Sequence, residues 1–177
     1  MKAAVYERYG PPEVVTIKEV AKPTITDNEI LIRVRATTVS SGDWRMRSLS
    51  VPFGLGLICR LMFGFFGPKK PILGSELAGD IEAVGKNVTK FKIGDAVFAF
   101  PGIGLGAHAE YRAMPADGAV ALKPTNLSYE QAAALCFGGT TALDFLKTKG
   151  SIRRGETVLI IGASGTVGSA AVQIAKR

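Results

Sequence analysis

The turn with the clearest potential for chemistry lies near the end of the printed sequence. Residues 162–168 read GASGTVG, follow the apolar run VLII at 158–161, and precede an amphipathic segment at 167–174. A buried strand, a tight small-residue turn and a helix in this order form the phosphate-binding unit of dinucleotide-binding folds. We therefore predict that Gly165 lets the backbone approach a pyrophosphate and that Gly168 lets the helix pack closely on the strand.

The same turn departs from the usual fingerprint at its first glycine, where the sequence has Ala163. A structural strand-turn-helix without any ligand is therefore the alternative interpretation. The residue that reads the adenosine ribose would lie roughly 20 residues after the turn, which is beyond Arg177. The sequence thus predicts a dinucleotide site and leaves the choice between NAD and NADP open.

Composition places the chain among ordinary globular proteins. Of its 177 residues, 47% are hydrophobic and 21% are charged, so one domain, or one domain and part of another, can bury a core. The formal net charge is +7, but lysine and arginine are scattered along the chain, which favours a solvated surface over nucleic-acid binding. A positive potential would also attract a phosphorylated cofactor.

Cysteine usage and the N-terminal residues predict a cytoplasmic location. The two cysteines, Cys59 and Cys136, lie in apolar surroundings, which is typical of a reducing compartment. The first residues show a strand pattern and lack the apolar core of a secretory signal.

One apolar segment, residues 51–66, has some membrane character. It contains Arg60 and several glycines and is too short to cross a bilayer as a helix. We predict that it packs over a pocket or an interface, and shallow contact with a membrane surface is the alternative. On this basis we expect no membrane partner.

The first 120 residues are predicted to be mostly β-structure. Alternating apolar residues and glycine-rich turns predict strands at residues 2–6, 14–19, 30–38, up to 84, 96–100, 107–114 and 119–122, with Ile30, Ile32, Val34 and Ala36 on one face of the third. A short helix over residues 41–48 would be capped by Ser41 and would carry Asp43 in its first turn. Many short strands with glycine turns are typical of a closed or partly closed barrel.

The pattern changes to helix after Leu127. Ser128 and Gln131 stand near the start of an apolar helical face with capping-box spacing, and Gly138 and Gly139 are expected to break that helix before it resumes over residues 141–147. We place the boundary so that residues 1–126 form one domain and residues 127–177 begin a second. The predicted fold class is α+β with a β-rich majority.

Four segments together resemble the medium-chain dehydrogenase/reductase superfamily, and within it the zinc-free quinone oxidoreductases. They are residues 74–79 (GSELAG) with Val84 and Gly85, residues 91–97 (FKIGDAV), residues 107–111 (AHAEY), and residues 155–158 (GETV) through 173–176 (QIAK). The resemblance covers the whole chain. It implies a GroES-like, alcohol dehydrogenase-like N-terminal domain, a partly closed β-barrel over residues 1–126. The first strand and helix of a truncated Rossmann-type nucleotide-binding domain would follow over residues 127–177.

The resemblance also locates the positions that hold catalytic zinc in relatives that use it. A catalytic zinc needs three ligands from cysteine, histidine or carboxylate side chains. Here those positions are occupied by Ser40, Ser75 and Phe137, and Cys136 beside the third would be a lone thiol. The loop that carries a structural zinc is absent as well. We therefore expect no zinc and no metal site.

Cofactor contacts are implied at a small set of residues. Ser40 matches a position near the nicotinamide where such reductases often carry asparagine, and Thr141 matches a threonine that contacts the nicotinamide end, although it could instead cap a helix. Asp43 suits a helix start as well as a substrate site, and we expect His108 to be structural. The implied phosphate-side contacts are Ser164, Gly165, Thr166, Val167 and Gly168. No general acid is identified.

The resemblance implies the N-terminal portion of an NAD(P)H-dependent oxidoreductase that transfers hydride to a quinone or enone without zinc. NADP is the expected cofactor, NAD is possible, and the expected partner is a small carbonyl or quinone substrate, with a homo-oligomer possible. The 177-residue chain alone should be inactive. A zinc-independent alcohol dehydrogenase and a non-catalytic relative that binds a cofactor or a partner protein are the alternatives.

Overall fold

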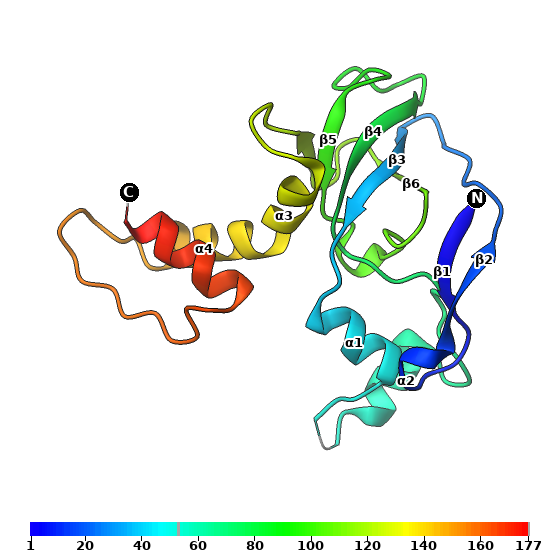
Figure 1. Cartoon of the computed structure of the whole chain (residues 1–177), viewed down its shortest axis with the longest axis horizontal. Helices are drawn as coiled ribbons and strands as arrows, with labels where there is room; N and C mark the ends of the chain where they lie inside the picture. The colour runs from blue at the N-terminus through cyan, green and yellow to red at the C-terminus, as the bar shows by residue number, and fades with distance from the viewer. Residues whose placement is uncertain (53, 177) are drawn as a thin grey trace. The chain divides into compact units, whose positions relative to one another are not determined.

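The computed structural model describes residues 1–52 and 54–176, so Phe53 of the apolar segment lies outside the described residues. The chain divides into two compact units, Met1–Ala133 and Ala134–Arg177, each of which is described by itself. Figure 1 shows that strands belong to the first unit and that the second contains only helices and loops.

Two antiparallel sheets form the first unit. Strands β1 and β2 pair in a two-stranded sheet, and five more strands pair in the order β6-β3-β4-β5-β7. Single bridges from Ala3 to Ala109 and from Val5 to Ile72 tie β1 to loops of the larger sheet. The strands are β1 (Lys2–Tyr6), β2 (Val15–Glu19), β3 (Glu29–Thr37), β4 (Leu77–Val84), β5 (Ala96–Ala99), β6 (Tyr111–Pro115) and β7 (Val120–Leu122).

The alternating apolar pattern of the sequence explains the core of the larger sheet. Ile30 and Ile32 of β3 are fully buried, and Ile32 pairs with Ile81 of β4. The predicted inward face of β3 is confirmed at these residues, while Val34 and Ala36 farther along are half-buried. The predicted strand at residues 107–114 is wrong at its start, because ladder pairing begins only at Tyr111.

Two α-helices follow β3 in the first unit, α1 (Ser41–Ser48) and α2 (Gly56–Phe63). The range of α1 is as predicted, but its cap is Ser40 rather than Ser41. The Ser40 side chain accepts from the Asp43 backbone N–H, and the Asp43 carboxylate accepts from the Ser40 backbone N–H. This reciprocal capping box needs an acid three residues after the cap, and Asp43 stands at that spacing from Ser40.

Helix α3 (Tyr129–Leu143) starts on the larger sheet. The Tyr129 hydroxyl donates to one carboxylate oxygen of Asp80, and Arg35 Nε donates to the other at 2.7 Å. Burial alone would raise the pKa of the Asp80 carboxyl, but the hydrogen bonds from Tyr129 and Arg35 outweigh it and hold that pKa below its usual value. A charged cluster on β3 and β4 thus fixes the first turn of α3.

The predicted helix break at Gly138 and Gly139 is wrong, because α3 runs through both residues. A glycine in a helix costs only about 1 kcal/mol relative to alanine, so it lowers stability without ending the helix. Gly138 also has a packing reason, since a Cβ there would lie 2.5 Å from the Thr166 methyl group. The helix continues as a π-helical turn over Asp144–Lys149.

The second unit packs α4 (Thr166–Ala175) against the end of α3 and the segment before the glycine turn. Its core contains Ala142, Leu146 and Ala171, with Val158 and Ile160 packed against them. The strand predicted at residues 158–161 does not form: Leu159 and Ile161 are 86% and 90% exposed, and no described segment pairs with this backbone. A strand exists only through the hydrogen bonds of a neighbour, which local apolar pattern cannot supply.

The mixed, β-rich architecture predicted from the sequence is confirmed. Among the described residues, none of the helices has the length and apolar character needed to cross a membrane.

Candidate functional site

The Asp43 carboxylate is the centre of a hydrogen-bond network at the start of α1. One oxygen accepts from the Ser40 backbone N–H and from the Ser40 hydroxyl, both at 2.8 Å, and the other accepts from the Gly74 backbone N–H at 2.9 Å. Asp43 is only 5% exposed. A buried carboxylate with several donors holds them in fixed positions, so Asp43 ties the α1 start to the loop before β4.

The loop between β3 and α1 is fixed from the other side by Glu76 and His108. The Thr38 hydroxyl donates to the buried Glu76 carboxylate, and His108 Nε2 lies 2.9 Å from the Thr38 carbonyl oxygen. The imidazole therefore has a structural partner on this loop, in agreement with the interpretation of His108 as structural. Together these contacts hold Ser40 on a rigid support.

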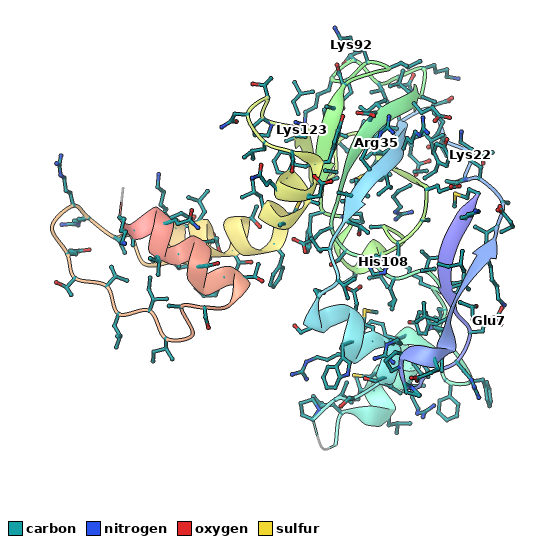
Figure 2. All side chains as sticks on the ribbon, in the orientation of Figure 1. Glu7, Lys22, Arg35, Lys92, His108 and Lys123 are labelled. Carbon is teal, nitrogen blue, oxygen red and sulfur yellow. The ribbon has the colours of Figure 1, made fainter. Side chains whose placement is uncertain are left out.

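A cleft of about 800 Å³ lies beside this network, entirely within the first unit. Its walls come from β1, β2, the end of β3, α1 and the loop around His108, which Figure 2 labels between the two sheets. Most of the exposed wall surface is apolar, although charged residues, including Lys2, Arg35, Arg47 and Glu110, also line the cleft. The lining residues include Tyr6, Ile17, Val39, Asp43, Trp44 and His108.

Tyr6 and Trp44 give the cleft its aromatic surfaces. Tyr6 is 2% exposed, and burial, together with the nearby Tyr9 and Asp43, raises the pKa of its hydroxyl to about 12. The Tyr6 hydroxyl therefore releases its proton less readily than the hydroxyl of an exposed tyrosine. Trp44 is 48% exposed and stands on the first turn of α1, one residue after Asp43. The cleft thus suits a planar, largely apolar molecule.

Sequence reasoning missed Tyr6 and Trp44 as cleft residues. The cleft is assembled from segments that lie tens of residues apart, and neither residue has a local motif around it. The only local sequence pattern near the cleft was the helix-capping pattern around Asp43.

The residues at the three positions linked to zinc do not offer a ligand set. The Ser40 hydroxyl is committed to Asp43, and Phe137 has no ligand atom in its side chain. Cys136 is 3% exposed within α3. Across residues 1–52 and 54–176, no three His, Cys, Asp or Glu side chains gather closely enough to hold a metal ion.

The glycine turn of the second unit leads directly into α4. Gly165 is the N-cap residue and supplies no side-chain cap, and residues 161–166 are exposed. The first backbone N–H groups of a helix lack intrahelical partners and favour an anion. A Cβ built on Gly165 would meet only the Gly162 carbonyl oxygen, at 3.5 Å. The turn therefore fits a phosphate group, with open space over its backbone.

Gly168 has a different role in the same turn. A Cβ there would lie 2.1 Å from the Gly162 carbonyl oxygen, and Gly162 itself has a φ of +75°. The chain can fold back onto α4 only because Gly168 has no side chain. Ser164, Thr166 and Val167 lie in the same turn, Ser164 and Thr166 exposed and Val167 half-buried.

Thr141 lies in the last part of α3, where its residue is half-buried. Because α3 begins at Tyr129 and continues through Thr141, the interpretation of Thr141 as a helix-start cap is wrong. Thr141 shares the second unit with the glycine turn, and Ser40 belongs to the first unit.

Comparison with known proteins agrees with this geometry. Residues 26–124 match the alcohol dehydrogenase GroES-like domain. Quinone oxidoreductase from Homo sapiens is 38% identical over 181 residues, covering 99% of this chain and 50% of that protein, and the Pseudomonas aeruginosa protein of the same name is 35% identical over 176 residues, with 99% and 49% covered. The chain spans about half the length of the curated relatives it matches.

Solved structures show the same relationship. Quinone oxidoreductase from Coxiella burnetii superposes with a TM-score of 0.84 at 31% identity, covering 99% of this chain and 53% of that one. The Escherichia coli quinone oxidoreductase, solved in complex with NADPH, gives 0.80 at 29% identity, with coverage of 99% and 49%.

Proposed function

The chain belongs to the medium-chain dehydrogenase/reductase superfamily through its alcohol dehydrogenase GroES-like domain, and we propose that it forms part of an NAD(P)H-dependent oxidoreductase. The reaction is transfer of a hydride to a quinone or enone without zinc. The observation that carries the proposal is the apolar cleft beside Ser40, with aromatic walls and no metal-ligand set among the described residues.

A bound nicotinamide cofactor would supply the hydride. The turn at Ser164, Gly165, Thr166, Val167 and Gly168 would hold its pyrophosphate, with Ser40 and Thr141 at the nicotinamide end. The Ser40 hydroxyl donates to the Asp43 carboxylate and accepts from the Asp43 backbone N–H, so its oxygen keeps one further lone pair. That lone pair would accept from the carboxamide N–H of the nicotinamide. Asp43 thereby fixes the direction in which Ser40 presents that oxygen.

The cleft would bind and orient the acceptor. A quinone or an enone spreads the developing negative charge over its own conjugated carbonyl, so the protein needs no Lewis acid for that step. The walls around Tyr6, Trp44 and Val39 would exclude water from a planar ring. A small carbonyl or quinone is thus the proposed substrate partner.

NADP is the proposed cofactor, with NAD as the alternative. The net charge of +7 favours a ligand with additional phosphate, and two structural relatives were solved with NADPH.

We further propose a cytoplasmic location, a homo-oligomer and no nucleic-acid partner. The 177-residue chain on its own is proposed to be inactive, because a dinucleotide site is built from both halves of its fold.

Zinc content tests the metal-free part of the proposal. Purified protein, freed of any affinity tag, is expected to contain far less than one zinc per chain in elemental analysis, because Ser40, Ser75 and Phe137 replace the ligand types. A zinc alcohol dehydrogenase purified in parallel is the positive control. Stoichiometric zinc that survives dialysis would refute this part of the proposal.

A further inference from the structure

Helix α2 turns its apolar face toward solvent. Residues four apart lie on the same side of a helix, so Leu57 and Leu61 share one side of α2 with their neighbours Ile58 and Met62. Cys59 and Phe63 lie on the other side and are half-buried. Six exposed side chains, which we call the α2 patch, have exposed fractions between 47% and 98%: Leu57, Ile58, Leu61, Met62, Phe65 and Phe66. Exposed apolar clusters of this kind mark interaction surfaces.

The charged residues of the segment that carries the α2 patch have one sign. Between Asp43 and Glu76 the sequence contains five basic residues and no acidic residue. Arg60 donates to the Phe65 carbonyl oxygen at 3.0 Å, and Lys69 donates to the Leu61 carbonyl oxygen at 2.9 Å, so both cations stand at the patch.

Glu7, an acidic residue of the N-terminal segment, does not change the basic character of the patch margin. The Glu7 backbone lies against Gly67, but the Glu7 carboxylate is paired with Lys18 at 2.7 Å. The patch therefore combines an apolar centre with a basic margin.

The basic margin of the α2 patch favours an anionic membrane surface over a second copy of this chain. A second copy joined by two-fold symmetry would place the same patch against itself, and the cations of Arg60 and Lys69 would repel their own copies. An anionic phospholipid surface offers both an apolar layer for the side chains and negative headgroups for the cations.

We propose that the α2 patch inserts shallowly into the interface of an anionic phospholipid bilayer. The apolar side chains enter the boundary between headgroups and acyl chains, and Arg60 and Lys69 contact the headgroups. The proposal replaces the expectation of no membrane partner with the alternative stated for residues 51–66, which is shallow contact with a membrane surface. The proposal does not depend on the reaction catalysed.

Co-sedimentation with vesicles tests the proposal. The chain is expected to sediment with phosphatidylcholine vesicles that contain about one-third phosphatidylglycerol, and to bind vesicles of phosphatidylcholine alone at least about tenfold more weakly. The double substitution Leu61→Ser with Phe66→Ser should lower the partition coefficient on the anionic vesicles by at least about tenfold, because two apolar side chains no longer leave water.

Ile93→Ser is the matched control. Ile93 is 65% exposed and follows Lys92, which Figure 2 labels at the end of the first unit remote from α2. Its substitution should leave vesicle binding unchanged. The proposal is overturned if the chain does not sediment with anionic vesicles, or if the double variant sediments as well as the parent. A dimer in sedimentation velocity that the double substitution dissolves would instead assign the patch to a second copy.

Discussion

Replacing Gly165 with valine is expected to weaken NADPH binding about a hundredfold in a protein that carries this chain with a complete nucleotide-binding domain. The valine side chain would stand over the exposed turn where the backbone N–H groups of α4 face the phosphate, and loss of two charge-assisted hydrogen bonds costs roughly 3 kcal/mol. Gly165 has φ −76° and ψ 168°, which any residue adopts, and open space around its Cβ position, so the variant should fold.

Two comparisons sharpen this test. Thr141→Val should reduce affinity by less than about tenfold, since it removes at most one neutral hydrogen bond. Gly168→Ala should lower the melting temperature instead, because its Cβ would lie 2.1 Å from the Gly162 carbonyl oxygen. Calorimetric titration with NADPH and thermal melts separate the two effects. Unchanged affinity in a folded Gly165→Val protein would show that the turn does not hold the phosphate.

Removal of the Asp43 carboxylate is expected to produce the largest loss of stability. Asp43→Ala leaves the backbone N–H groups of Ser40 and Gly74 without their acceptor in a buried place, which should lower the free energy of unfolding by about 3 kcal/mol. Asp43→Asn keeps one acceptor oxygen, so its loss should be about half as large.

Urea denaturation measures these differences. Asp117→Ala in the exposed turn before β7 is the matched control and should change stability by less than about 0.5 kcal/mol. If Asp43→Ala unfolds at the same urea concentration as the parent, the network around Ser40 does not support the site as described.

The local pattern of apolar and polar residues was sufficient to predict many of the strands and helices of the first unit. Alternation in β3 identified the buried faces of Ile30 and Ile32, and the helix over residues 41–48 was found from its polar first turn. The cap was misplaced by one residue because Ser40 and Ser41 are equivalent in type, and only the contact with Asp43 distinguishes them.

Long-range contacts explain what local pattern missed. The hydrogen bond from Gly74 to Asp43 joins segments 31 residues apart, and the cleft needs both sheets and α1 at once. Two glycines suggested a broken α3, but packing of Gly138 against Thr166 favours the continuous helix. The apolar run at residues 158–161 resembled a strand in composition, although strand formation depends on a partner that no described segment provides.

Acceptor-dependent oxidation of NADPH is the most direct test of the proposed chemistry. A protein that carries this chain with a complete nucleotide-binding domain should consume one NADPH for each naphthoquinone reduced, as hydride and a solvent proton convert the quinone to its hydroquinone. The rate should be unaffected by a zinc chelator, and ethanol with NADP should give no reaction. No oxidation with any quinone or enone, or a rate abolished by the chelator, would contradict the account.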